Sequence, residues 1–169
     1  MASPFKTGLA TLKRLGLKAE ASMVDDIETA DEFSEVMISA HAPAAVGEQR
    51  LNIAATDEPF RRLSIDTIVA YVKAASRYPH VRQVNIHFAP KRYVADSQPH
   101  GQEGDYDLLI DGVREIAAFA DTCGIEIVME NINAYWTDLG DDVQAEDVDW
   151  SDRNVYFGMA PEEWAQTCE

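Results

Sequence analysis

The stretch IEIVMENIN, residues 125–133, is the part of the sequence that decides the predicted fold. It follows Gly124, which closes a helix-like run, and its aliphatic portion is short and rich in β-prone residues. Such a segment is typical of a parallel strand that is buried in an α/β protein. The apolar run then ends on Glu130 and two asparagines, so the strand delivers polar side chains at its carboxyl end.

Two earlier apolar segments end in the same way. Residues 36–40 run into His41, and residues 84–86 run into His87. In parallel α/β folds the carboxyl ends of the strands form the edge at which chemistry takes place. Two histidines and Glu130 at three such ends therefore predict a shared site.

The alternation of side chains across a strand supports this prediction. Successive residues point to opposite faces, and His41, His87 and Glu130 all fall on the faces opposite the aliphatic ones. The aliphatic faces suit covering helices, and the polar faces can point together into a barrel. The predicted aliphatic positions are Ile38, Ala40, Val84, Ile86, Phe88, Ile125, Ile127 and Met129.

Hydrophobic spacing predicts the remaining elements. Helices are expected at residues 4–15, 59–78 and 105–123, a short helix at 25–35, and a last helix beginning at Pro161. Strands are expected at 17–23, 36–40, 81–88 and from 125 onward, with long loops at 42–58, 89–104 and 134–159. Strands that alternate with helices indicate a parallel sheet. A barrel of eight such units needs about 250 residues, so this chain has room for about half of one.

Composition narrows the class of protein. The chain has 169 residues, which suggests one domain, and no apolar run approaches the roughly 20 residues that span a bilayer. Its net charge of −16 opposes binding to nucleic-acid phosphate. Two cysteines without metal-type spacing and no secretory signal predict a cytoplasmic protein with no membrane partner.

Four short motifs carry a family resemblance. They are SAHAP at residues 39–43, LNIAA at 51–55, NIHFAP at 85–90 and MENIN at 129–133. In this order they resemble the xylose isomerase-like TIM barrels, which include sugar (phosphate) isomerases and epimerases and the endonuclease IV type of DNA repair enzyme. The resemblance is best over residues 36–133. It implies an α/β fold in which residues 1–169 form a single domain, an incomplete (β/α)8 TIM barrel.

The resemblance also implies divalent-metal chemistry. Glu130 would be a metal ligand, while His41 and His87 match positions that bind zinc in the endonuclease branch and line the pocket in the isomerase branch. The remaining ligands of that family, an Asp, a His and a Glu, come from later strands. We therefore expect weak metal binding by this chain, and self-association through open sheet edges.

Alternative interpretations of the site residues stay open at this point. Each histidine can be a hydrogen-bonded core residue, and Glu130 can bind loop amides or form a network with Asn131 and Asn133. Imidazole with carboxylate suits Zn, Mn, Fe or Co, whereas oxygen-rich later ligands would favour Mg or Mn. Asn131, Asn133 and Trp136 are candidate pocket residues.

Other polar groups give weaker signals. His80 precedes a strand and is expected at the surface, as is His100 in a Pro/Gly-rich loop. The acidic run at residues 141–152 begins like a calcium-binding loop, but it lacks the required glycine and the bidentate glutamate. We therefore interpret this run as a solvated segment.

The sequence is compatible with three hypotheses for the function of this protein. The first is a metal-dependent isomerase or epimerase acting on a sugar or polyol, with Glu130 as the catalytic carboxylate and proton transfer beside a carbonyl group. The second is an endonuclease IV-like zinc phosphodiesterase, which the net charge of −16 opposes. The third is a non-catalytic barrel fragment.

Overall fold

The computed structural model describes residues 4–21, 34–47, 49–90, 103–130, 157–158, 164–165 and 167. The chain divides into two compact units. Unit 1 comprises residues 1–44, 67–86 and 116–128, and unit 2 comprises residues 45–66, 87–115 and 129–169. Most of the expected helix at 25–35 and the expected loop at 134–159 lie outside the described residues, as does the start of the last helix.

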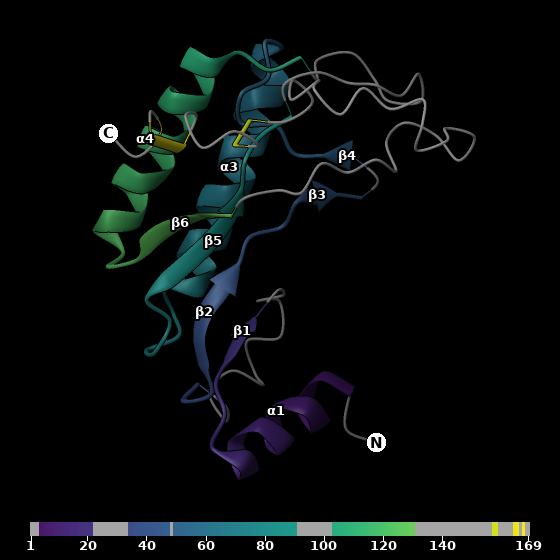
Figure 1. Cartoon of the computed structure of the whole chain (residues 1–169), viewed down its shortest axis with the longest axis vertical. Coiled ribbons are helices and arrows are strands. Elements are labelled where there is room, and N and C mark those ends of the chain that lie inside the picture. Colours follow the sequence, from purple (N-terminus) through teal and green to yellow (C-terminus); the bar gives the residue numbers. More distant parts are fainter. Residues whose placement is uncertain are drawn as a thin grey trace, which may run out of the picture. The chain divides into compact units, whose positions relative to one another are not determined.

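Unit 1 contains a four-stranded parallel sheet with the strand order β1-β2-β5-β6 (Figure 1). The strands are β1 (Ala19–Ala21), β2 (Met37–His41), β5 (Gln83–His87) and β6 (Glu126–Glu130). They alternate with helices along the chain, so the predicted α/β class with parallel strands is confirmed. Each of the three strands predicted to carry a site residue exists and ends on that residue.

Backbone pairing fixes how these strands lie against one another. Ser39 pairs with Gln83, and His41 pairs with Asn85. The amide of Ala42 continues the ladder by donating to the carbonyl oxygen of Asn85 at 2.8 Å. On the other side of β5, the amide of Glu126 donates to the carbonyl oxygen of Arg82 at 2.8 Å. The carboxyl ends of β2, β5 and β6 therefore lie at one edge of the sheet.

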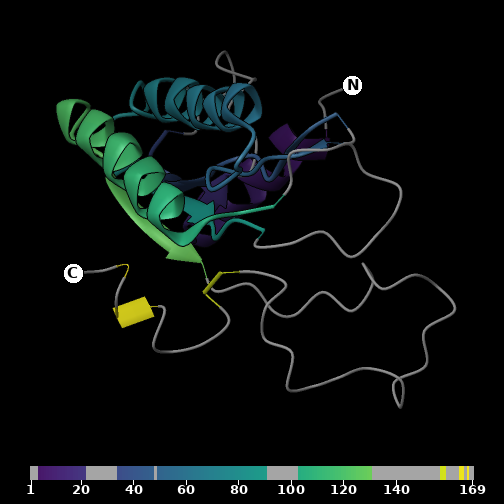
Figure 2. The ribbon, with the colours of Figure 1, turned by 90° about the horizontal axis from the view of Figure 1, so that it is seen from above.

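Among the described residues, the complete helices are α1 (Pro4–Leu15), α3 (Glu58–Ala75) and α4 (Tyr106–Thr122). Each of them lies close to its predicted range. Asp57 caps α3 by accepting from the amide of Phe60 at 2.9 Å, and Asp105 caps α4 by accepting from the amide of Leu108 at 3.1 Å. The carboxyl-terminal halves of α3 and α4 belong to unit 1, and both helices lie on the same face of its strands (Figure 2). None of the described helices is long and apolar enough to cross a membrane.

The aliphatic faces of the strands form much of the core, although Ile127 and Met129 are only half-buried and Ile38 is exposed. Ala40, Val84, Ile86 and Ile125 are buried, as predicted from alternation. Ile38 shares a face with Ala40 but is 45% exposed, so the prediction that helices cover it is wrong. Strand alternation tells which face a side chain takes, but it does not tell how far the covering helices extend along that face.

The expected loop after Ala42 contains a small hairpin that the sequence did not reveal. Strands β3 (Ala45–Val46) and β4 (Gln49–Arg50) pair antiparallel in unit 2. Gly47 lies in their turn with φ 62°, a left-handed conformation that glycine adopts without strain. Strands of two residues are too short to produce a detectable alternation, which explains the incorrect loop prediction.

Candidate metal site

Three strands each end on a residue that can bind a metal. His41 is the last residue of β2, His87 of β5 and Glu130 of β6. Because parallel strands present their carboxyl ends at one edge, and because all three residues occupy the same strand parity, their side chains emerge on the same face of the sheet. Local sequence thus sets the direction of each side chain, and strand pairing brings them together.

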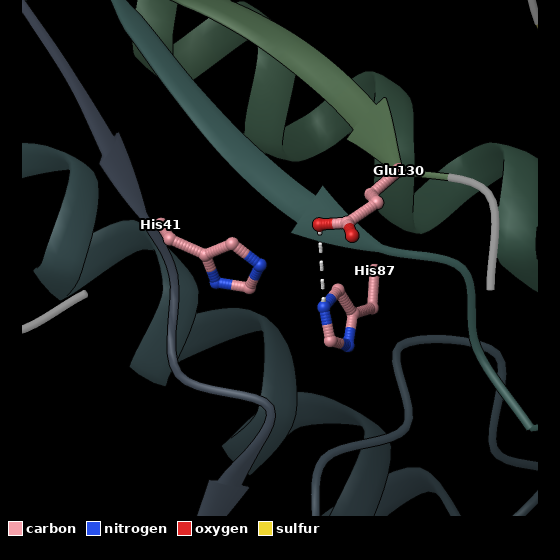
Figure 3. A group of neighbouring side chains, drawn as sticks. All are labelled: His41, His87 and Glu130. Carbon is pink, nitrogen blue, oxygen red and sulfur yellow. Dashed lines mark ion pairs between the residues drawn. The ribbon is translucent and has the colours of Figure 1, made fainter. Parts of the chain in front are cut away.

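His87 and Glu130 form a pair within unit 2. Their Nε2 and Oε2 atoms are 3.6 Å apart, the ion pair drawn as a dashed line in Figure 3. This distance is longer than a hydrogen bond between a ring nitrogen and a carboxylate. The side chains are 26% and 42% exposed, respectively, so small molecules can reach both.

His41 has a contact that bears on its tautomer. Its Nδ1 atom lies 2.8 Å from the carbonyl oxygen of Ala42. A carbonyl oxygen only accepts hydrogen bonds, so Nδ1 is the donor in this contact and, of the two neutral tautomers, the contact selects the one with the proton on Nδ1. In that tautomer Nε2 carries the lone pair, which is the state that a metal-binding imidazole requires.

The three side chains form a group that can hold a metal ion. The ligand atoms offered by His41, His87 and Glu130 all lie within 4.8 Å of one another (Figure 3). Metal bonds of about 2.1 Å place two ligand atoms at most about 4.2 Å apart. Binding would therefore draw the side chains only slightly closer, and two imidazoles with one carboxylate are a suitable donor set for a divalent cation.

The same face of the sheet carries a second polar layer within unit 1. Ser39 donates a hydrogen bond to Glu20 at 3.3 Å, and Gln83 donates one to Glu126 at 2.9 Å. Glu126 is exposed and lies on the same strand and face as Glu130. This second carboxylate of β6 therefore accepts a hydrogen bond from a neutral amide, whereas Glu130 faces an imidazole.

Several candidate residues receive no test from the structure. Asn131, Asn133 and Trp136 lie outside the described residues, and so does His100. Their roles in a pocket stay predictions. His80 is exposed, as the sequence predicted.

Sequence reasoning did not single out Asn52. This residue lies in the LNIAA motif, is fully buried, and forms hydrogen bonds to three different parts of unit 2. The feature of the sequence that could have identified Asn52 is an amide side chain within a short apolar run. Buried amides are kept where their hydrogen bonds are satisfied, so this pattern indicates a structural connection between segments.

The parallel sheet, its helices on one face and the ligand-type residues at its carboxyl edge define the class: an α/β protein built from barrel-type strand–helix units. Residues 14–153 match the family model of the xylose isomerase-like TIM barrel, and the chain belongs to this family. No curated protein matches the chain.

Two solved structures with a similar fold are D-psicose 3-epimerases. A D-psicose 3-epimerase with D-tagatose, from Clostridium cellulolyticum H10, is 15% identical with a TM-score of 0.53, and the match covers 78% of this chain and 48% of that one. A D-psicose 3-epimerase in the presence of D-fructose is 16% identical with a TM-score of 0.53, covering 79% of this chain and 49% of that one.

A further neighbour is a xylose isomerase-like TIM barrel protein from Mycobacterium smegmatis in complex with magnesium. It is 17% identical with a TM-score of 0.48, and the match covers 76% of this chain and 47% of that one. The chain thus spans about half the length of the solved structures that it matches.

Proposed function

We propose that this protein acts as a divalent-metal-dependent isomerase or epimerase that transfers a proton beside the carbonyl group of a sugar or polyol. The observation that carries the proposal is the group formed by His41, His87 and Glu130 at the carboxyl ends of neighbouring strands. Membership of the xylose isomerase-like family and the epimerase neighbours, one with D-tagatose and one with D-fructose, support a sugar as the substrate class.

In this proposal the three side chains hold the cation. Nε2 of His41 and a ring nitrogen of His87 would bind as neutral ligands, and Glu130 would supply the negative charge. When bound, a divalent cation holds and polarises the carbonyl and hydroxyl oxygens of a substrate. The donor set fits Mn, Zn or Co, and further oxygen ligands would extend this range to Mg.

Glu130 is also the proposed catalytic carboxylate. Its side chain is 42% exposed, so a bound sugar can approach it. A carboxylate that lies beside a polarised carbonyl group can accept the proton from the neighbouring carbon and return it on the same face, as isomerisation requires, whereas epimerisation also needs a proton donor on the opposite face. Asn131, Asn133 and Trp136 follow Glu130 in the sequence and are proposed to contribute to the sugar pocket.

The chain spans only part of a barrel, which lowers the activity that we expect from this chain alone. We propose that residues 1–169 form one incomplete barrel domain, because the match covers about half of each solved neighbour. The proposed ligands then number three, and a complete octahedral or tetrahedral shell requires additional groups. We therefore expect weak metal binding and low turnover from this polypeptide alone.

Metal titration tests the proposed site directly. Isothermal titration of Mn²⁺ into the unmodified chain should show one weak site, and Glu130→Gln should weaken it about tenfold or more, since the amide loses the negative charge. Glu126→Gln is the matched control, because it removes the other carboxylate on the same face of β6. Equal effects of the two variants, or no effect of either, would show that the three-residue group is not a metal site.

Solvent exchange tests the chemistry. The protein loaded with Mn²⁺ is incubated in D₂O with D-fructose or D-tagatose, and deuterium at the carbon beside the carbonyl group is measured by NMR. Exchange of one proton demands less of a site than complete turnover, so slow incorporation is expected even from a partial barrel. Incorporation that persists in Glu130→Gln would assign the base to another residue.

A further inference from the structure

Asn52 connects its own segment to two others in unit 2, to Pro90 through its buried side chain and to Ser64 through its backbone amide. Its exposed fraction is 0%. Its Nδ2 atom donates to the carbonyl oxygen of Pro90 at 3.1 Å, and its Oδ1 atom accepts from the amide of Ala54 at 2.9 Å. Its backbone amide donates to Oγ of Ser64 at 2.9 Å, on the first turns of α3. A buried amide without such partners would be costly, so these bonds fix its orientation.

The bond to Pro90 acts on the segment that carries His87. Only two residues separate His87 from Pro90, and both of them, Phe88 and Ala89, are buried. The carbonyl oxygen of Ala89 accepts from the amide of Phe157 at 3.1 Å. The chain just beyond the end of β5 is therefore held at two successive carbonyl groups, by the amide of Phe157 at Ala89 and by the side chain of Asn52 at Pro90.

A fixed segment after β5 restricts the imidazole of His87. This ring lies 3.6 Å from Glu130, and a metal-binding pair must keep such a separation within a few tenths of an ångström. If the Pro90 carbonyl were released, the peptide planes after His87 could rotate, and the ring would sample a wider range of positions. Removing a group that orients a metal-ligating residue commonly weakens metal affinity by about 10–100-fold.

We propose that Asn52 is a positioning residue for His87, acting through the carbonyl oxygen of Pro90. This inference rests on the proposed function for the purpose of the positioning, the ligand role of His87, whereas the restriction of the ring by Asn52 can be measured separately. An asparagine suits the task because one side chain must donate to Pro90 and accept from Ala54 at the same time. Aspartate retains only the acceptor, and an aliphatic residue retains neither group.

The test uses variants that separate this bond from general stability. Asn52→Ser keeps an acceptor for the Ala54 amide but is too short to reach Pro90. Asn52→Asp keeps the size of the side chain but replaces the Nδ2 donor by an oxygen, which the carbonyl oxygen of Pro90 repels. Ser64→Ala is the control, because it removes the bond between this loop and α3 and leaves the Pro90 bond intact. If Asn52→Asp fails to fold, Asn52→Ser alone decides.

Two measurements on the full chain give the outcome. Mn²⁺ titration should show about tenfold weaker binding for the Asn52 variants and a change within about twofold for Ser64→Ala. In the metal-free protein, the imidazole NMR signal of His87 should shift or broaden in the Asn52 variants only. Unchanged affinity and signal in a folded Asn52 variant would overturn the proposal, and so would equal changes in Ser64→Ala.

The NMR measurement also separates this inference from the proposed function. If the unmodified chain binds no Mn²⁺, the proposed function fails, and the His87 signal then decides the positioning role by itself. A change confined to the Asn52 variants would support it, whereas no change would overturn it.

Discussion

Gly104 is a residue at which a single added carbon atom should be costly. It precedes α4 in unit 2 and forms an isolated bridge with Ala55. A Cβ at this position would clash with the carbonyl oxygen of Pro90 and would lie 2.8 Å from Cε2 of Phe157. Backbone oxygen cannot move aside as a flexible side chain can, so the absence of a side chain here is a packing requirement.

We expect Gly104→Ala to lower the free energy of unfolding by about 1–3 kcal/mol, the usual cost of overpacking a closely packed region. Gly8→Ala is the control, because a Cβ at Gly8 meets nothing within 4 Å and this residue lies inside α1. That substitution should be neutral or should stabilise the helix by up to about 1 kcal/mol. Urea denaturation of both variants gives the comparison, and similar stabilities would contradict the predicted clash.

The helices α3 and α4 are joined by an ion-pair network in unit 2. Arg62 of α3 donates from Nη1 to Oε2 of Glu115 of α4 at 2.9 Å, and its Nη2 lies 2.7 Å from Oε1 of the same carboxylate. The guanidinium also binds Asp66 one turn along α3. The hydrogen bond from Arg62 holds the pKa of Glu115 below its ordinary value, against a smaller opposing effect of partial burial. The same bond raises the pKa of Arg62.

This network should make a small, pH-dependent contribution to stability. A carboxylate whose pKa is lowered by folding stabilises the protein above its unfolded pKa, which is about 4.3 for Glu. The contribution disappears as the pH falls through the lower, folded-state pKa. Glu115→Gln should therefore cost about 0.5 kcal/mol at pH 7, as expected for a half-exposed pair, and nothing in strong acid.

A double-mutant cycle with Arg62→Met isolates this coupling from the effects of the single substitutions. Thermal unfolding is measured for the four proteins at pH 7 and at several acidic values. A coupling energy that stays constant from pH 7 to strong acid would contradict the assigned ionic interaction.

Two properties of the chain have opposite effects on self-association: its edge strands favour it, and its net charge opposes it. The outer strands of the four-stranded sheet are β1 and β6, and strands at sheet edges can pair with another chain. The net charge of −16 produces repulsion between copies. Salt screens charges that are more than about 10 Å apart at 0.1 M ionic strength. Added salt should therefore weaken the repulsion between copies and allow the sheet edges to pair.

We therefore expect sedimentation velocity to show mainly monomer in dilute buffer and increasing dimer or larger species in about 0.5 M salt, where charges are screened over a shorter distance than at 0.1 M. A shift that depends on protein concentration would identify reversible association. A single monomeric species in both conditions would show that the sheet edges do not mediate self-association.

Patterns among neighbouring residues are enough to predict most of the elements and the direction of their side chains. Alternation and helical spacing depend on neighbours within a few residues, so they predicted the parallel α/β class, the three principal strands and the polar residues at their ends. The motifs that contain His41, His87 and Glu130 also indicated the family, which the match over residues 14–153 confirms.

Only the tertiary structure decided what depends on contacts between distant residues. The separation of 3.6 Å between His87 and Glu130 follows from strand pairing and from the segments that hold the strand ends. The exposure of Ile38, the space missing at Gly104 and the burial of Asn52 each depend on which segment packs against them. Residues 52 and 90 are far apart in the sequence, and no local pattern reveals that one supports the other.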